Sequence, residues 1–142
     1  MSRIVNLSEA ASIALHSMII VARSKRMINL NEIAEMMGTS KNHLAKITQI
    51  LVKRNFLKST RGPSGGFVLK KTADKISLLE IFECIEGSIE NEGCPLDKQI
   101  CPFGKCLMGN IFHKVTDEVK DYMRTQTLKD YIETGFNQNL KK

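Results

Sequence analysis

Two short helical patterns joined at Gly38 constrain this chain more than any other feature. Residues 29–37 and 41–55 each carry apolar side chains at the spacing of one helix face, and Gly38 stands between them as a helix-ending residue. Thr39 and Ser40 can cap the second helix. A short helix, a tight turn containing glycine and a second helix with polar and basic residues at its start are the layout of a helix-turn-helix. In such a unit the second helix enters the major groove of DNA.

A predicted β-hairpin follows the second helix directly. Residues 56–60 and 67–71 have the composition of short strands, and residues 61–66 between them form a turn rich in glycine. This hairpin would be the wing of a winged helix-turn-helix. Arg61 at its tip has the length and charge to enter a narrow minor groove, and the glycines let the backbone approach phosphate.

Positive charge is concentrated over these same segments. Residues 41–75 hold nine Lys or Arg residues against one acid, whereas the whole chain of 142 residues has a net charge of +6. A local excess of this kind is typical of a polyanion-binding surface, so double-stranded DNA is the expected partner. The first turns of the second helix are expected to read base edges. The predicted DNA contacts are Lys41, Asn42, His43, Lys46, Arg61 and Ser64.

Further helices flank this unit. We expect a first helix over residues 7–23, a short strand over 27–30 and, opened by a capping box at Ser77, a helix that ends at Gly87. Beyond residue 107, apolar residues recur at steps of four and three, which predicts a helix with a heptad seam about two repeats long. The seam comprises Met108, Phe112, Val115, Val119 and Tyr122 and predicts a homodimer.

Together these patterns predict a mainly α fold with a small β-hairpin, in which a winged helix-turn-helix precedes a long C-terminal dimerisation helix. A chain of 142 residues, 42% of them hydrophobic, is expected to bury one core. The expected organisation is a DNA-binding unit over 1–87, a cysteine-rich loop over 88–106, the dimerisation and terminal helices over 107–135, and a flexible tail over 136–142.

The sequence predicts a cytoplasmic protein without a membrane partner. No apolar stretch approaches the roughly 20 residues that span a bilayer, and the N-terminus lacks the layout of a signal peptide. In the cytoplasm the four cysteines are expected to be reduced thiols, metal ligands or redox sensors rather than structural disulfides.

Three of these cysteines, Cys94, Cys101 and Cys106, fall within thirteen residues beside two prolines and a glycine. Thiolate sulfur is a soft donor that suits both iron–sulfur clusters and zinc. Three thiols in one loop therefore predict a metal site, although the absence of a Cys-x2-Cys pair leaves the metal open. The chain also lacks a nucleotide-binding glycine motif and a nucleophile–base pair, so we do not expect an enzyme.

The order of these elements resembles the Rrf2 family of bacterial transcription regulators. The resemblance implies a winged-helix homodimer that binds palindromic operators. Members with three cysteines after the wing form an iron–sulfur branch that senses nitric oxide, oxidative stress, iron or cluster supply. By this resemblance Cys94, Cys101 and Cys106 would hold a [4Fe-4S] or [2Fe-2S] cluster. The matching segments include Ile33-Ala34-Glu35 and residues 14–16, 40–46, 61–69, 76–80 and 127–130.

A fourth ligand does not follow from the resemblance. The cysteine spacing is x6 and x4 rather than the more usual five and five. Gly109 stands where cluster-biogenesis regulators have a histidine ligand, and Ser12 stands where nitric-oxide sensors have a carboxylate. The remaining candidates are His16, Glu9, His113 and Cys84.

The sequence therefore predicts a DNA-binding transcription regulator, a repressor or an activator, whose operator binding is controlled by an iron–sulfur cluster. Whether the apo or the holo form binds DNA stays open. The alternative is the same fold sensing through zinc or through direct oxidation of its thiols.

Overall fold

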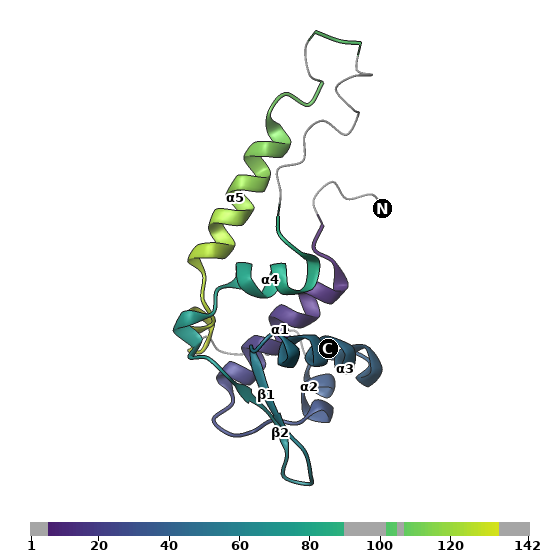
Figure 1. The fold of residues 1–142 in the computed structure, drawn as a ribbon, viewed down its shortest axis with the longest axis vertical. Coiled ribbons are helices and arrows are strands. Elements are labelled where there is room, and N and C mark those ends of the chain that lie inside the picture. The colour runs from purple at the N-terminus through teal and green to yellow at the C-terminus, as the bar shows by residue number, and fades with distance from the viewer. Residues whose placement is uncertain (1–5, 90–101, 105–106, 134–142) are drawn as a thin grey trace.

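The structure is a computed structural model that describes residues 6–89, 102–104 and 107–133 (Figure 1). Over these residues the chain forms five α-helices, two short 3₁₀ helices and one antiparallel hairpin, which confirms the predicted mainly α fold. The elements are α1 (Glu9–Arg23), α2 (Leu30–Met37), α3 (Lys41–Lys53), β1 (Leu57–Thr60), β2 (Gly66–Leu69), η1 (Ala73–Lys75), α4 (Leu78–Glu86), α5 (Ile111–Thr125) and η2 (Leu128–Tyr131).

Helix α1 lies at the centre of the body and packs against α2, α3, α4 and β2. One hydrophobic core joins these elements, and its fully buried side chains come from segments far apart in the sequence. Burial of such side chains stabilises the fold by about 1.5–3 kcal/mol each. The largest fully buried apolar residues are Met18, Ile33, Leu44, Leu51, Leu57, Ile76, Ile81 and Leu128.

The long helix α5 leaves this body at the end opposite the hairpin (Figure 1). Its C-terminal end is anchored where the Leu78 amide donates to the Gln126 carbonyl at 2.9 Å and the Leu128 amide donates to the Ile76 carbonyl at 3.0 Å. Met123 is buried, whereas every other residue of α5 is exposed or half-buried. No helix among the described residues is long and apolar enough to cross a membrane.

Local sequence signals explain most helix ends. Side chains of Ser8, Asn29 and Ser40 accept amide hydrogen bonds at the starts of α1, α2 and α3, as N-cap residues do. Ser77 and Glu80 form the predicted reciprocal capping box at the start of α4.

Three boundaries differ from the expectations. Helix α3 ends at Lys53 rather than at residue 55, because Asn55 adopts a left-handed conformation with φ 67° and turns the chain into β1. Met108 lies in a turn before α5, so it precedes the helix that carries the rest of the seam. The predicted strand over 27–30 is reduced to a single bridge between Ile28 and Phe67.

Candidate nucleic-acid interface

The start of α3 presents a polar surface. Its apolar side chains, including Leu44 and Ile47, are buried in the core, which directs Lys41, Asn42 and Lys46 outward, where all three are exposed. The turn that precedes α3 depends on Gly38, whose φ of 64° is a left-handed conformation that favours glycine. This arrangement leaves the first turns of α3 free to contact a partner.

His43 differs from its neighbours because it is half-buried against the start of α1. Its Nδ1 atom lies 3.9 Å from Oε1 of Glu9, and the Glu9 side chain is itself exposed. The His43 amide also donates to the Ser40 side chain at 3.2 Å, which caps α3. The structure therefore places a predicted base-reading residue beside a carboxylate.

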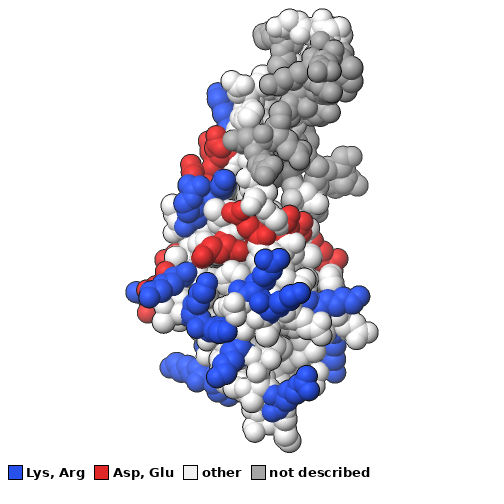
Figure 2. Space-filling view, in the orientation of Figure 1, with Lys and Arg blue, Asp and Glu red and all other residues white. Residues whose placement is uncertain are grey.

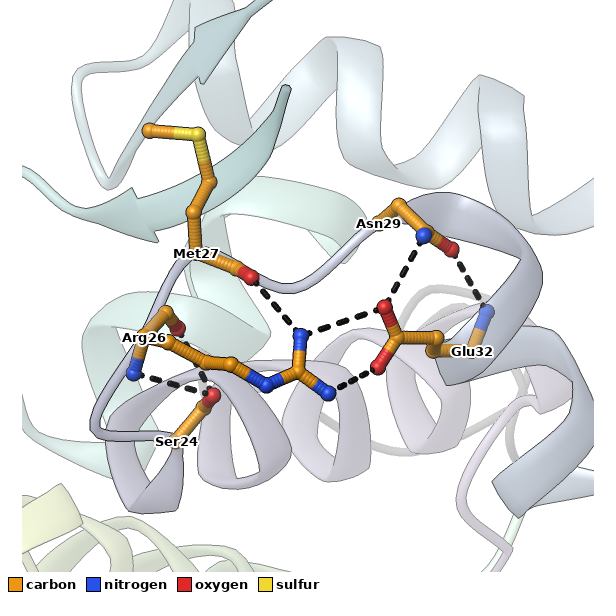
Figure 3. A network of polar contacts seen from close by, with 5 residues as sticks. All are labelled: Ser24, Arg26, Met27, Asn29 and Glu32. Carbon is orange, nitrogen blue, oxygen red and sulfur yellow. Dashed lines mark hydrogen bonds and ion pairs between the residues drawn. The ribbon is translucent and has the colours of Figure 1, made fainter. Parts of the chain in front are cut away.

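A polar network fixes the loop between α1 and α2 (Figure 3). The Arg26 guanidinium donates to both carboxylate oxygens of Glu32, at 2.6 and 3.2 Å, and to the Met27 carbonyl at 3.1 Å. Asn29 bridges the Glu32 amide and carboxylate at 2.9 Å each. The hydrogen bond from Arg26 lowers the pKa of the Glu32 carboxyl group. This network holds the start of α2 in place next to Ile28, which forms a bridge to Phe67 of the hairpin.

The hairpin is tied to the same loop. Its strands pair in register from Leu57 opposite Leu69 to Thr60 opposite Gly66. The Phe67 amide donates to the Ile28 carbonyl at 2.8 Å, and the Ile28 amide donates back to the Phe67 carbonyl at 3.3 Å. One hydrogen bond in each direction between this residue pair fixes β2 of the hairpin to the body.

The hairpin tip is exposed. Gly62 has a φ of 109° and accepts a hydrogen bond from the Gly65 amide at 3.0 Å, which closes the turn. Arg61 and Ser64 project from this turn, and both are exposed. The hairpin extends beyond α2 and α3 (Figure 1), so its tip can reach a partner that also contacts α3.

A groove of about 550 Å³ lies between α3 and the hairpin. One stripe of α3 forms one wall, and the two strands with their turn form the other. The groove is lined by Asn29, Leu30, Ala45, Thr48, Gln49, Val52, Lys53, Ser59, Thr60, Arg61, Gly62, Gly65, Gly66 and Phe67. None of these residues is acidic.

Charged side chains are unevenly distributed on the face shown in Figure 2. Lys and Arg side chains lie over the lower body, and acidic side chains, mixed with further Lys and Arg side chains, lie above them, toward α4 and α5. A partner with negative charge would therefore meet less repulsion at the hairpin end than near α5.

The three cysteines predicted to bind a metal lie outside the part of the chain that the structure describes. Cys94, Cys101 and Cys106 fall outside the described residues. Among the residues that are described, no group of three or more His, Cys, Asp or Glu side chains could hold a metal ion. Cys84 is half-buried on α4, and burial raises the pKa of its thiol.

His16 and His113 are both exposed, on α1 and α5. The Nδ1 atom of His16 lies 2.6 Å from the Ser12 carbonyl oxygen. A ring nitrogen that faces a carbonyl oxygen at this distance carries the proton, which leaves Nε2 of the neutral ring as an acceptor. Among the candidate fourth ligands, His16 thus has an oriented ring with one nitrogen available.

The comparison with known protein families shows which family this chain belongs to. The family model of Rrf2, described as an iron-dependent transcriptional regulator, matches residues 7–134. The chain belongs to the Rrf2 family. It is accordingly a DNA-binding transcription regulator and not an enzyme.

Individual relatives agree with this assignment. An HTH-type transcriptional regulator of Aquifex aeolicus is 30% identical over 110 residues, which are 75% of this chain and 76% of the relative. The HTH-type transcriptional regulator IscR of Pectobacterium atrosepticum is 26% identical over 121 residues, which are 84% of this chain and 70% of the relative. The solved structure of CymR, the global cysteine regulator of B. subtilis, has the same fold, with a TM-score of 0.74 at 24% identity over 91% of this chain and 97% of CymR.

In this Rrf2 regulator the structure brings the predicted DNA contacts into two groups, one at the start of α3 and one at the hairpin tip. Sequence reasoning did not find the groove between them. The α3 residues that line the groove recur at helical spacing, which is visible in the sequence. They mix apolar and polar side chains, as the flank of any surface helix does, so the pattern alone did not indicate a groove. These residues are 45, 48, 49, 52 and 53.

Proposed function

We propose that this Rrf2 chain is a homodimeric transcription regulator that binds palindromic operators and is controlled by an iron–sulfur cluster. In this proposal the DNA-binding unit lies within residues 1–87, the cluster loop lies within residues 88–106, and the protein acts in the cytoplasm. The observation that carries the DNA part is the exposed polar start of α3 beside a projecting hairpin.

In the proposed complex the start of α3 lies in the major groove. Asn42, His43 and Lys46 face base edges there, because amide, imidazole and ammonium groups can donate to base acceptors. Lys41 contacts the adjacent phosphate. Arg61 enters the minor groove, and Ser64 contacts its backbone wall. The family-level role supports this placement, and mutagenesis of the individual contacts tests it.

Homodimer formation is proposed through α5. Val119 is 39% exposed and Tyr122 is 57% exposed, and both lie on a helix whose seam residues Phe112 and Val115 are only half-buried. An apolar helix face of this kind is typical of a seam that a second helix covers. A twofold dimer presents two α3 helices, which explains the expectation of a palindromic operator.

The cluster is proposed to be held by Cys94, Cys101 and Cys106. Three thiolates in one loop are a donor set that fits iron–sulfur clusters. The description of the family as iron-dependent supports iron over zinc. When bound, the cluster would supply a redox- and nitric-oxide-reactive centre. The nitrogen Nε2 of His16 is our first candidate for an additional ligand, ahead of Glu9, His113 and Cys84.

Control through zinc or through direct thiol oxidation is the alternative for the same fold, because the thiols themselves can bind zinc or oxidise. Metal analysis separates the two sensing chemistries. The DNA-binding part of the proposal is the same in both cases.

Cysteine substitution tests the proposed control. We expect Cys94→Ala, Cys101→Ala and Cys106→Ala each to remove bound iron and sulfide and to change operator affinity, while circular dichroism shows that the helical fold is retained. Gln99→Ala is the matched control, because it changes the same loop without removing a thiol. Operator affinity that is the same in all three cysteine variants as in the anaerobically purified protein would contradict cluster control.

A further inference from the structure

Helix α1 begins beside the start of α3, and its first residue faces a side chain of that helix. Oε1 of Glu9 lies 3.9 Å from Nδ1 of His43. The Ser8 side chain caps α1 and donates a hydrogen bond to the Glu86 carboxylate, which fixes the point where α1 begins. The cap at Ser40 fixes the start of α3 in the same way. Because α1 and α3 also pack against each other, the fold itself holds the carboxylate beside the imidazole.

The contact leaves both side chains accessible. The His43 side chain is 36% exposed and the Glu9 side chain is 80% exposed. A separation of 3.9 Å is longer than a hydrogen bond, so the carboxylate acts on the ring through its charge. Of the two ring nitrogens, Nδ1 is the one that faces this charge.

The charge affects where the ring carries its proton. A neutral imidazole has a proton on one nitrogen, and the other nitrogen is an acceptor. An ionised carboxylate has no proton to donate, so it favours the form in which the nitrogen nearer to it carries the N–H. Glu9 therefore favours the proton of His43 on Nδ1, which leaves Nε2 as an acceptor. Only the other neutral form of the ring could donate to a base through Nε2.

An acceptor at this place on α3 would select among bases. In the major groove the hydrogen-bond donors are the amino groups of cytosine and adenine, whereas guanine and thymine present only acceptors and the thymine methyl group. The exposed lysines on either side of His43, Lys41 and Lys46, can only donate. His43 thus complements their chemistry with an acceptor.

We infer that Glu9 is a positioning residue that fixes the proton of His43 on Nδ1, so that His43 accepts a hydrogen bond from the amino group of a cytosine or adenine in the operator. The step that concerns DNA rests on the function proposed above, in which His43 faces base edges. The step that concerns the ring is a property of the protein alone. Glu9 acts through His43 and does not itself touch the base.

Nitrogen NMR of isotope-labelled histidine tests the ring without DNA. The chain has three histidines, so the signals of His43 in the full-length protein are those that His43→Ala removes. At about pH 8, where an ordinary imidazole is neutral, we expect the proton of His43 on Nδ1. Glu9→Gln removes the charge at nearly constant size and introduces an amide that can also donate. We expect this variant to move the proton to Nε2 in a larger share of the molecules.

Glu35→Gln is the matched control, because it removes the same charge from an exposed carboxylate on α2. We expect it to leave the His43 signals as they are in the unmodified protein. A His43 ring with its proton on Nε2 in the unmodified protein would overturn the inference. So would a proton position that is the same in the Glu9→Gln protein.

Selection from a pool of DNA duplexes with a randomised centre tests the base preference. The anaerobically purified protein and the same protein after removal of iron are each used, and the bound duplexes are sequenced. The position that His43 reads is the one where His43→Ala loses its preference. We expect cytosine or adenine there, favoured about fivefold over guanine, which is the effect of one neutral hydrogen bond.

Glu9→Gln separates positioning from support of α1 in the same selection. We expect the variant to lose preference at the position read by His43 and to keep its preferences elsewhere. A general loss of affinity with unchanged base preferences would show that Glu9 only supports α1, and guanine at that position would show that His43 donates. Either result would overturn the inference.

The two measurements also separate this inference from the proposed function. If the unmodified protein selects no sequence in either form, the proposed function is wrong and the DNA step fails with it, while NMR still decides the role of Glu9. If the protein selects sequences but His43→Ala changes none of the preferences, the proposed function stands and the inference about the base is wrong.

Discussion

At the scale of single residues, the Arg26–Glu32 ion pair shows how a local contact supports the interface. Arg26 is exposed and Glu32 is half-buried at the surface, and ion pairs at the surface contribute little to stability. Its geometry is nevertheless bidentate, and its neighbour Asn29 caps α2. The pair therefore orders the loop that carries Ile28 to the hairpin.

The pH dependence of this pair can be measured. Its partner lowers the pKa of Glu32 in the folded protein, so the stabilisation is present above the unfolded pKa, about 4.3, and is lost as pH falls through the lower folded pKa. We expect Glu32→Gln to lower the thermal midpoint at pH 7 by no more than about 2 °C, with the difference vanishing in acid. Glu35→Gln, on the same helix, is the control. A constant difference from pH 7 down to pH 2 would contradict the account.

Gly66 is the residue where the hairpin meets the body most closely. Its φ of 153° and the approach of the Ile28 carbonyl leave no room for a side chain. We expect Gly66→Ala to destabilise the protein by about 1–3 kcal/mol and to weaken DNA binding through displacement of the hairpin. Chemical denaturation measures the first effect.

Gly104→Ala is the control for that substitution, because a Cβ atom on Gly104 would meet nothing within 4 Å. We expect its denaturation midpoint to match that of the unmodified protein. Equal stability of the Gly66 and Gly104 variants would show that the hairpin tolerates a shift where Gly66 meets the Ile28 carbonyl.

At the scale of elements, the sequence predicted what local chemistry determines. The caps at Ser40 and Ser77 and the turn at Gly38 follow from hydrogen-bonding groups and backbone freedom within a few residues. The end of α3 could not be predicted in this way. Asn55 is an ordinary helix residue in a pattern, and its left-handed conformation is accompanied by a hydrogen bond from Lys70, fifteen residues later, at 2.8 Å.

The candidate site could likewise be predicted only where it depends on local sequence. Charge and motif order indicated Lys41, Lys46 and Arg61 as candidate DNA contacts, and all three are exposed in the structure. The groove depends on how far the hairpin stands from α3, which is set by the Ile28–Phe67 bridge and the close packing at Gly66. Such distances between elements are tertiary properties that no local pattern contains.

Helix α5 provides the test of assembly. We expect Val119→Glu to dissociate the dimer, because it places a carboxylate in an apolar seam, and to weaken operator binding as a consequence. Sedimentation velocity over a range of protein concentrations measures the assembly state. Glu118→Gln is the control on the flank of the same helix. A Val119→Glu protein that remains dimeric would place the dimer contact elsewhere.

At the scale of the whole molecule, the interface and the candidate assembly helix lie at opposite ends. The hairpin projects from one end of the body and α5 from the other (Figure 1), while α1 connects the core between them. In the proposed dimer, a change near the start of α5 would reach α3 by altering how the two protomers are placed, because operator affinity would depend on the spacing of the two α3 helices.

The central claim is that an iron–sulfur cluster controls DNA binding by this Rrf2 regulator. The most direct test is to purify the protein anaerobically, measure its iron, sulfide and zinc content, and determine its operator affinity before and after addition of nitric oxide. We predict a brown protein with nearly equal iron and sulfide, an absorption that nitric oxide bleaches, and a change in affinity that accompanies the bleaching. A colourless protein with zinc or free thiols, whose affinity nitric oxide leaves unchanged, would contradict the claim.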